Sequence, residues 1–124
     1  MNATKKIITG IYAITDAHLL ANEVIYDKVS KAIDAGISVL QYRNKIATYD
    51  LQHQQAEKLN VLCQKNKVIF IINDNIKLAK DVSADGVHLG KTDYSIDQAR
   101  ELLGDNSIIG LSCYNQLSVA MTAQ

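Results

Sequence analysis

The chain has 124 residues, of which 48% are hydrophobic and 21% charged, so its composition is that of a globular domain and excludes a disordered or fibrous protein. Thirteen basic residues balance thirteen acidic ones, which leaves no net charge with which to hold nucleic acid or an anionic membrane. Since the longest apolar run, residues 68–72, is too short to cross a bilayer and the first residues lack the apolar stretch of a secretory signal, we expect a cytoplasmic protein.

Strands and helices are predicted to alternate along the chain. Val24, Ile25 and Val29 have the three- and four-residue spacing of a helix that ends at Gly36, and Thr48 is a suitable N-cap for the next helix. Short apolar runs bounded by turn residues indicate strands. The predicted strands are residues 11–15, 38–43, 68–73, 86–90 and 108–113. The predicted helices are residues 22–35, 49–65, 75–82 and 95–103, with a further one beginning near residue 115.

This alternation, at roughly 20-residue spacing, predicts a single domain, residues 1–124, with a parallel sheet and right-handed crossovers. Two α/β folds have this pattern. A doubly wound sheet of five strands is complete at this length, whereas a β/α barrel needs eight units and typically more than about 200 residues. Periodicity alone therefore favours the doubly wound sheet.

Three polar residues stand at or just beyond the end of the second predicted strand. The two-residue period of a strand places Gln41, Arg43 and Lys45 on one face. A guanidinium fork and an ammonium group suit the charged oxygens of a pyrophosphate, because the fork fixes orientation and the lysine adds a point charge. The alternative is an ordinary strand end with solvated cations.

Further polar residues follow the next three strands. Asn73 and Asp74 come after the third strand, where they are also typical turn residues, and Asp93 comes after the fourth, where it is also a possible helix cap. Two carboxylates beside a pyrophosphate suit Mg²⁺, which takes one or two protein carboxylates and completes its shell with water and phosphate. Ser112 ends the fifth strand, where its hydroxyl could donate a hydrogen bond to a phosphate or simply bond to the backbone, whereas His88 is expected to be a core histidine.

These polar residues share one location in the fold, the carboxyl ends of successive strands. Parallel α/β folds place their chemistry there, which favours a functional site over coincidence. The sequence has no GxGxxG after the first strand and no GxxxxGK[ST], so nucleotide binding by those loops is not supported.

Five segments of the chain resemble those of the thiamine-phosphate synthases, in the same order and at similar spacing. The segments are residues 11–16 (IYAITD), 36–45 (GISVLQYRNK), 71–74 (IIND), 84–93 (ADGVHLGKTD) and 109–112 (IGLS). The resemblance implies a TIM-barrel type of fold, of which the chain holds about five β/α units, and this replaces the doubly wound sheet as the expected fold. It also implies that the chain is the amino-terminal portion of such a synthase.

The resemblance implies a role for each residue that matches the family's motifs. The pyrimidine pyrophosphate substrate would be bound by Gln41, Arg43, Lys45, Asn73 and Ser112. Mg²⁺ would be held by Asp74 and Asp93. The family's reaction is substitution at the pyrimidine methylene with loss of pyrophosphate, with the thiazole nitrogen as nucleophile. The expected partners are thus these small molecules, with no nucleic acid and no membrane.

The chain departs from the family's pattern in two ways. Lys91 stands where a glutamine is usual, and strands later than the fifth, with the loops expected to bind thiazole phosphate, are not in the sequence. A sheet of five strands would expose two edges and its inner face, which favours self-association. There are two alternatives to the synthase function. One is a related thiazole tautomerase, which shifts a proton without a pyrophosphate substrate, and the other is an inactive truncated remnant.

Overall fold

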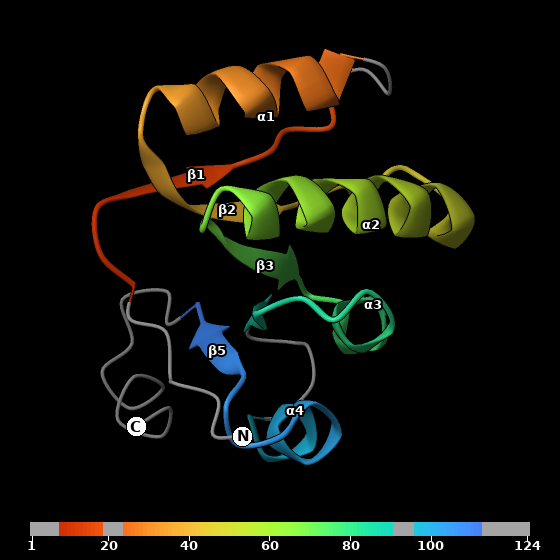
Figure 1. Ribbon diagram of the computed structural model, residues 1–124. Coiled ribbons are helices and arrows are strands. Elements are labelled where there is room, and N and C mark those ends of the chain that lie inside the picture. The colour runs from red at the N-terminus through yellow and green to blue at the C-terminus, as the bar shows by residue number, and fades with distance from the viewer. Residues whose placement is uncertain (1–7, 19–23, 91–95, 113–124) are drawn as a thin grey trace.

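The computed structural model describes residues 8–18, 24–90 and 96–112, in which strands and helices alternate (Figure 1). The strands are β1 (Ile11–Ile14), β2 (Ile37–Tyr42), β3 (Ile69–Asn73), β4 (Gly86–Leu89) and β5 (Ile108–Leu111). The helices are α1 (Val24–Asp34), α2 (Tyr49–Lys65), α3 (Ile76–Asp81) and α4 (Ile96–Leu103). The predicted order is confirmed, with small shifts at the element ends. Position 113 and the helix predicted from residue 115 lie outside the described residues.

Local sequence signals account for where several helices begin and end. Thr48 is the N-cap of α2, and its hydroxyl oxygen accepts a hydrogen bond from the backbone N–H of Leu51 at 3.3 Å. Asn75 caps α3 in the same way through Leu78. Gly36 follows α1 with a φ of 103°, a left-handed conformation that glycine adopts without strain. The predicted cap at Thr48 and stop at Gly36 are confirmed.

The five strands form one parallel sheet in sequential order, β1-β2-β3-β4-β5. A doubly wound sheet would reverse its strand order and carry helices on both faces, but here the four helices all cover one face (Figure 1). Sequential parallel strands with helices outside are the arrangement of a β/α barrel. The barrel-type fold is confirmed, and the doubly wound sheet that periodicity favours is wrong.

The main core lies between the sheet and its helices. Alternate strand residues such as Leu40, Tyr42 and Phe70 point toward the helices and are buried in one cluster with Leu59 of α2. Removing this apolar surface from water is the main stabilising contribution to the fold. The opposite face of the sheet carries a smaller apolar cluster, formed by Val39, Ile69, Ile71 and Ile108. Above that small cluster, toward the carboxyl ends of the strands, the inner face becomes polar.

Both edges of the described sheet are open. Within the described residues β1 pairs only with β2, and β5 pairs only with β4. Ile11 and Ile14 of β1 are 61% and 56% exposed, which is high for apolar strand residues. The expected exposed edges are thus present in the described sheet, and self-association through them stays a prediction.

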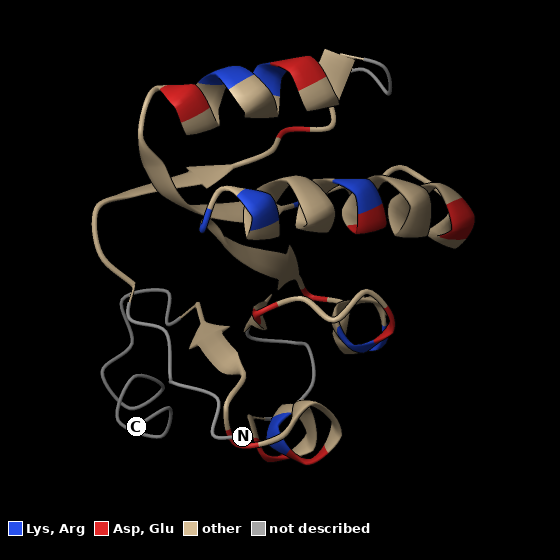
Figure 2. Cartoon of the chain, viewed as in Figure 1, with Lys and Arg blue, Asp and Glu red and all other residues tan. Residues whose placement is uncertain are grey.

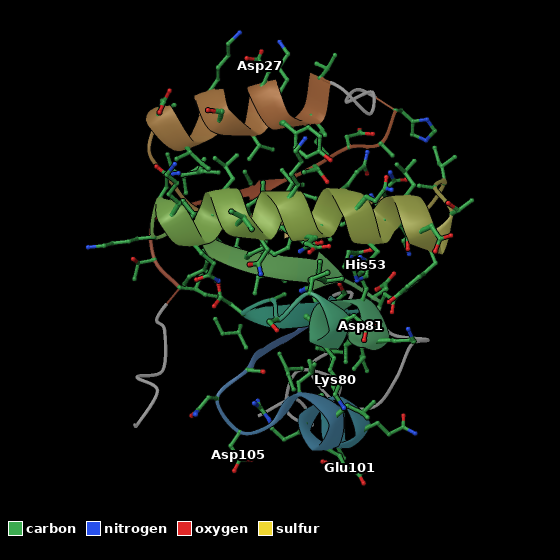
Figure 3. All side chains as sticks on the ribbon, turned by 45° about the vertical axis from the view of Figure 1, so that its right-hand side comes forward. Asp27, His53, Lys80, Asp81, Glu101 and Asp105 are labelled. Carbon is green, nitrogen blue, oxygen red and sulfur yellow. The ribbon has the colours of Figure 1, made fainter. Side chains whose placement is uncertain are left out.

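Charged side chains lie outside the sheet. No lysine, arginine, aspartate or glutamate belongs to any of the five strands, and Figure 2 shows both signs interspersed along the helices. In Figure 3, Asp27 on α1 and Glu101 on α4 lie at the outer surface of the helical layer. None of the helices in the described part of the chain has the length and apolar character needed to span a membrane.

Candidate functional site

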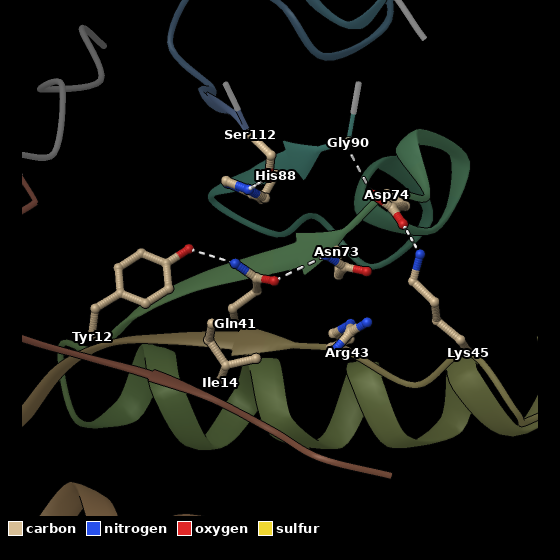
Figure 4. A pocket seen from close by; sticks show the side chains of 10 residues that line it. All are labelled: Tyr12, Ile14, Gln41, Arg43, Lys45, Asn73, Asp74, His88, Gly90 and Ser112. Atoms are coloured by element: carbon tan, nitrogen blue, oxygen red, sulfur yellow. Dashed lines mark hydrogen bonds and ion pairs between the residues drawn. The ribbon is translucent and has the colours of Figure 1, made fainter. Parts of the chain in front are cut away.

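A cavity of about 460 Å³ opens on the inner face of the sheet, at the carboxyl ends of the strands (Figure 4). All five strands or the residues that follow them contribute to its lining. The lining residues are Tyr12, Ile14, Gln41, Arg43, Lys45, Asn73, Asp74, His88, Gly90 and Ser112. Six residues that the sequence predicts for the site are therefore brought together at one cavity.

Strand β2 and the loop after it supply three of these side chains. Gln41, Arg43 and Lys45 all line the cavity, whereas Tyr42 between them is buried on the opposite face. The backbone of Arg43 is held by Thr15, whose hydroxyl oxygen accepts from the Arg43 N–H at 2.9 Å while its own proton goes to the Arg43 carbonyl at 3.2 Å. The predicted common face of the three residues is confirmed, and Thr15, directly after β1, fixes the position of the Arg43 backbone.

Asn44 shapes the loop that carries Lys45. Its side-chain oxygen accepts from the backbone N–H groups of Ile46 and Ala47 at 3.1 and 3.0 Å, a local turn that asparagine commonly makes. Its amide nitrogen donates to Gln55 of α2 at 3.3 Å, and the Tyr42 hydroxyl donates to the same oxygen. Burial raises the pKa of Tyr42 to about 12, so this hydroxyl remains a donor at neutral pH. Tyr42, just before the loop, and Asn44, within it, therefore both hold the loop to Gln55 of α2.

Asp74 holds its carboxylate at the mouth of the cavity. Its φ of 65° is left-handed, a conformation in which aspartate is enriched at turns, and its N–H donates to the His88 carbonyl at 2.8 Å. One carboxylate oxygen accepts from the N–H of Gly90 at 3.2 Å, and the other forms an ion pair with the Lys45 ammonium. Asp74 is thus a turn residue whose carboxylate also lines the cavity.

His88 and Ser112 form the part of the lining that comes from β4 and β5. The His88 Nε2 and Ser112 Oγ atoms are 2.7 Å apart, within hydrogen-bond distance. Gly110 lies under this imidazole, since a Cβ placed there would come within 2.6 Å of His88 Nδ1. The expectation of a core histidine is wrong, because Val87 and Leu89 point to the helices and leave His88 half-buried on the inner face.

Comparisons with known proteins agree with this arrangement. The family model "Thiamine monophosphate synthase" matches residues 11–124. This chain belongs to the thiamine monophosphate synthase family. The thiamine-phosphate synthase of Nitrosococcus oceani is 43% identical over 117 residues, covering 94% of this chain and 54% of that protein. That of Saccharophagus degradans is 46% identical over 114 residues, covering 91% and 52%.

A solved structure of the family has the same fold. The thiamine phosphate pyrophosphorylase from Pyrococcus furiosus superposes with a TM-score of 0.76 at 30% sequence identity, covering 90% of this chain and 55% of that one. The resemblance stated from the five sequence segments is confirmed. The chain spans about half the length of the family members that it matches.

The metal site predicted from the resemblance falls partly outside the described residues. Lys91 and Asp93 lie outside the described residues. The described part of the chain contains no cluster of three or more His, Cys, Asp or Glu that could hold a metal ion. Mg²⁺ needs only one or two protein carboxylates when a substrate phosphate supplies further oxygens. Asp74 fits this requirement, because its carboxylate lines the cavity and already faces a cation, the ammonium of Lys45.

Four lining residues were not among the sequence candidates: Tyr12, Ile14, His88 and Gly90. Tyr12 and Ile14 stand in a short apolar strand, which gave no sign of which face points inward. For His88 the sequence did carry a signal of its orientation. It lies between two apolar residues, Val87 and Leu89, so strand alternation places it on the face opposite to theirs. For Tyr12 the deciding observation is a hydrogen bond to Gln41, which depends on strand pairing.

Proposed function

We propose that this chain forms the pyrophosphate-binding half of a thiamine-phosphate synthase. The enzyme would be a transferase that joins hydroxymethylpyrimidine pyrophosphate to thiazole phosphate, giving thiamine phosphate and pyrophosphate. One observation carries the proposal: Arg43, Lys45, Asn73 and Asp74 converge on the mouth of a single cavity at the carboxyl ends of β2 and β3. The names of the similar proteins described above support the same activity.

The two cations would bind the pyrophosphate. Arg43 and Lys45 are exposed side chains at the cavity mouth. The planar guanidinium of Arg43 can bond two oxygens at once, and the ammonium of Lys45 acts as a point charge. Asn73 stands beside them at the end of β3, with its amide nitrogen bonded to Gln41 and its amide oxygen available to accept. Ser112, across the cavity on the residue after β5, would donate its hydroxyl proton to the same substrate.

Asp74, together with Asp93, would hold Mg²⁺. The ion, when bound, would neutralise charge that builds up on the departing pyrophosphate. The Gly90 N–H fixes one Asp74 oxygen, so the carboxylate is already oriented toward the cavity before any ligand enters. Arg43 and Lys45 would stabilise the same charge through hydrogen bonds that strengthen as the leaving group becomes more negative.

The reaction would be a substitution at the methylene carbon of the pyrimidine. The bond from this carbon to the pyrophosphate oxygen breaks, the electron pair leaves with pyrophosphate, and the thiazole nitrogen forms the new bond. Because the chain spans about half the length of its relatives, only the pyrophosphate half of this site is assigned to it. The thiazole phosphate contacts are left to residues beyond those described.

A titration tests the proposal directly. The chain is titrated calorimetrically with the pyrimidine pyrophosphate, with and without Mg²⁺. We expect binding that Mg²⁺ strengthens, and we expect Asp74→Asn to remove that effect while leaving metal-independent binding within twofold. Asp27→Asn, on the outer surface of α1, is the matched control. Binding that ignores both Mg²⁺ and the Asp74 change would contradict the metal assignment.

The other readings make different predictions. The tautomerase alternative is not favoured, because the similar proteins are named synthases and the residues proposed to bind pyrophosphate line one cavity. Tautomerisation of the thiazole by the purified chain without metal would restore it.

We further propose that the partners are small molecules rather than nucleic acid or membrane, and that the protein is cytoplasmic. Sedimentation at increasing concentration tests whether the exposed edge of β1 leads to self-association.

A further inference from the structure

The loop that carries Arg43 and Lys45 is held from the helical side of the sheet by two glutamines of α2. Gln52 Nε2 donates to the backbone carbonyl of Asn44 at 2.6 Å, and the side-chain oxygen of Gln55 accepts from Asn44 Nδ2 at 3.3 Å. The two glutamines stand three positions apart and therefore share one face of the helix. Neither of them lines the cavity described above. Both therefore contact the residue between the two cations from outside the site.

Gln55 is a polar residue buried in an apolar layer. It is 2% exposed, and its side-chain oxygen also accepts from the hydroxyl of Tyr42, the last residue of β2. A buried polar group that loses its partner carries the full cost of its desolvation, so the folded chain strongly favours these bonds. A methionine of similar length would fill the same space without needing such partners. The contribution of the amide is thus geometric, because it joins the end of β2 to the loop that follows.

Asn44 is held through three of its groups at once. Its carbonyl and its amide nitrogen are bonded to α2, and its side-chain oxygen accepts from two backbone N–H groups of the turn that follows. The backbone before it is also fixed, since Thr15 bonds to both the N–H and the carbonyl of Arg43. Arg43 and Lys45 thus reach the cavity from fixed backbone positions. A site that is ordered in advance loses less entropy when a ligand binds.

We infer that Gln55 is a positioning residue for the pyrophosphate site. Its buried oxygen holds Asn44 and thereby fixes where the arginine and the lysine on either side begin. Gln52 acts on the same loop through the Asn44 carbonyl. The inference rests on the proposed function, because pyrophosphate is the anion that these two cations are proposed to bind. It extends the site to residues of α2 that do not line the cavity.

The first test replaces each glutamine by methionine, which keeps the length of the side chain and removes its hydrogen bonds. Wild type and variants are titrated calorimetrically with the pyrimidine pyrophosphate in the presence of Mg²⁺. We expect Gln55→Met to weaken binding about fivefold and Gln52→Met about threefold, because the released loop has to be ordered again when the anion binds. Gln54→Met, at an exposed position of the same helix, is the matched control and should leave the affinity within about twofold of wild type.

A double variant separates positioning from stability. In Gln55→Met the buried hydroxyl of Tyr42 loses its acceptor on that residue, which lowers the free energy of unfolding. Adding Tyr42→Phe removes this unsatisfied group, so the double variant should resist urea better than Gln55→Met does. Its affinity should nevertheless remain about fivefold below that of wild type, because the bond to Asn44 is still missing. An affinity that recovers together with the stability would overturn the positioning role.

The outcomes distinguish this inference from the proposed function. If wild type binds the pyrimidine pyrophosphate and both methionine variants bind it equally well, the inference is overturned and the proposed function stands. If wild type does not bind it, the proposed function is overturned, and the inference with it. Gln52 is only half-buried, so if Gln55→Met does not fold, Gln52→Met decides by the same criterion.

Discussion

The ammonium of Lys45, on the loop after β2, forms an ion pair with the carboxylate of Asp74, on the loop after β3. The Lys45 side chain is 58% exposed, whereas that of Asp74 is 21% exposed and is fixed on its other oxygen by Gly90. A metal ion bound by Asp74 would have to share or displace this ammonium. A pyrophosphate would attract the ammonium instead, since it carries more negative charge than one carboxylate.

We therefore expect Lys45→Met to strengthen the binding of metal alone. An exposed ion pair contributes about 0.2–1 kcal/mol, so the gain should be about 1.4- to fivefold. The affinity for pyrophosphate should fall in the same variant, because a cation is lost from its site. The stronger binding of metal alone is measured by titrating the protein with Mn²⁺ in the absence of substrate and following the paramagnetic relaxation of water protons.

Arg43→Met is the matched control for this experiment. It removes one positive charge from the same cavity but no described ion pair with Asp74. We expect its Mn²⁺ affinity to rise less than that of Lys45→Met. Equal rises in the two variants would show that general charge, and not the ion pair, controls access to the carboxylate.

Glycines on the inner face of β4 and β5 should differ in their tolerance of a methyl group. At Gly110 an added Cβ meets the His88 ring at 2.6 Å, so Gly110→Ala should displace the imidazole from Ser112 and destabilise the fold by about 1–3 kcal/mol. At Gly86 the Cβ meets the Ile108 carbonyl oxygen at 1.9 Å, and backbone must move. Urea unfolding should show the larger loss for Gly86→Ala. A smaller loss at Gly86 would contradict this account of the β4–β5 contact.

Alternation within strands allowed much of the site to be predicted. The sequence around Tyr42 places Gln41 and Arg43 on the face opposite the core, and the position of Asn73 and Asp74 after an apolar strand places them at the same edge of the sheet. These predictions depend only on local periodicity. They therefore did not require knowledge of which strands are neighbours.

Features that depend on strand order and register were not accessible in this way. Periodicity could not choose between a sequential and a reversed strand order, because both place apolar residues on both faces. The hydrogen bond of Gln41 to Tyr12 joins residues 29 positions apart and exists only because β1 pairs with β2 in this register. The same holds for Lys45 and Asp74, whose pairing converts two separately predicted residues into one interacting unit.

The apolar layer between α2 and the sheet should carry much of the stability. Leu59 is fully buried in the main core, so Leu59→Ala should cost about 2–5 kcal/mol through lost transfer free energy and a residual cavity. Val61, on the same helix, is 64% exposed, and Val61→Ala should change stability by less than about 0.5 kcal/mol. Urea unfolding curves measure both. Similar losses in the two variants would contradict the assigned burial.

Stability should fall in alkaline solution because buried groups resist losing their protons. Burial, with a smaller effect of the nearby Asp85 charge, raises the pKa of the Cys63 thiol from 9.0 to about 12. Between these values the unfolded chain releases the proton while the folded chain retains it, so rising pH favours unfolding. The thiol's contribution is fully present below pH 9 and decreases by about 1.4 kcal/mol per pH unit until about pH 12.

Cys63→Ala isolates this contribution. We expect the variant to lose a pH-independent amount of stability for its smaller side chain, and to show a shallower decline between pH 9 and pH 10. In that interval the thiol titrates in the unfolded chain, whereas Tyr42, whose pKa rises from 10.0 to about 12, contributes mainly above it. Urea unfolding at half-unit pH steps from 8 to 11 provides the two slopes. Parallel curves for wild type and Cys63→Ala would mean that the thiol ionises equally well in both states, and would refute its burial as the cause.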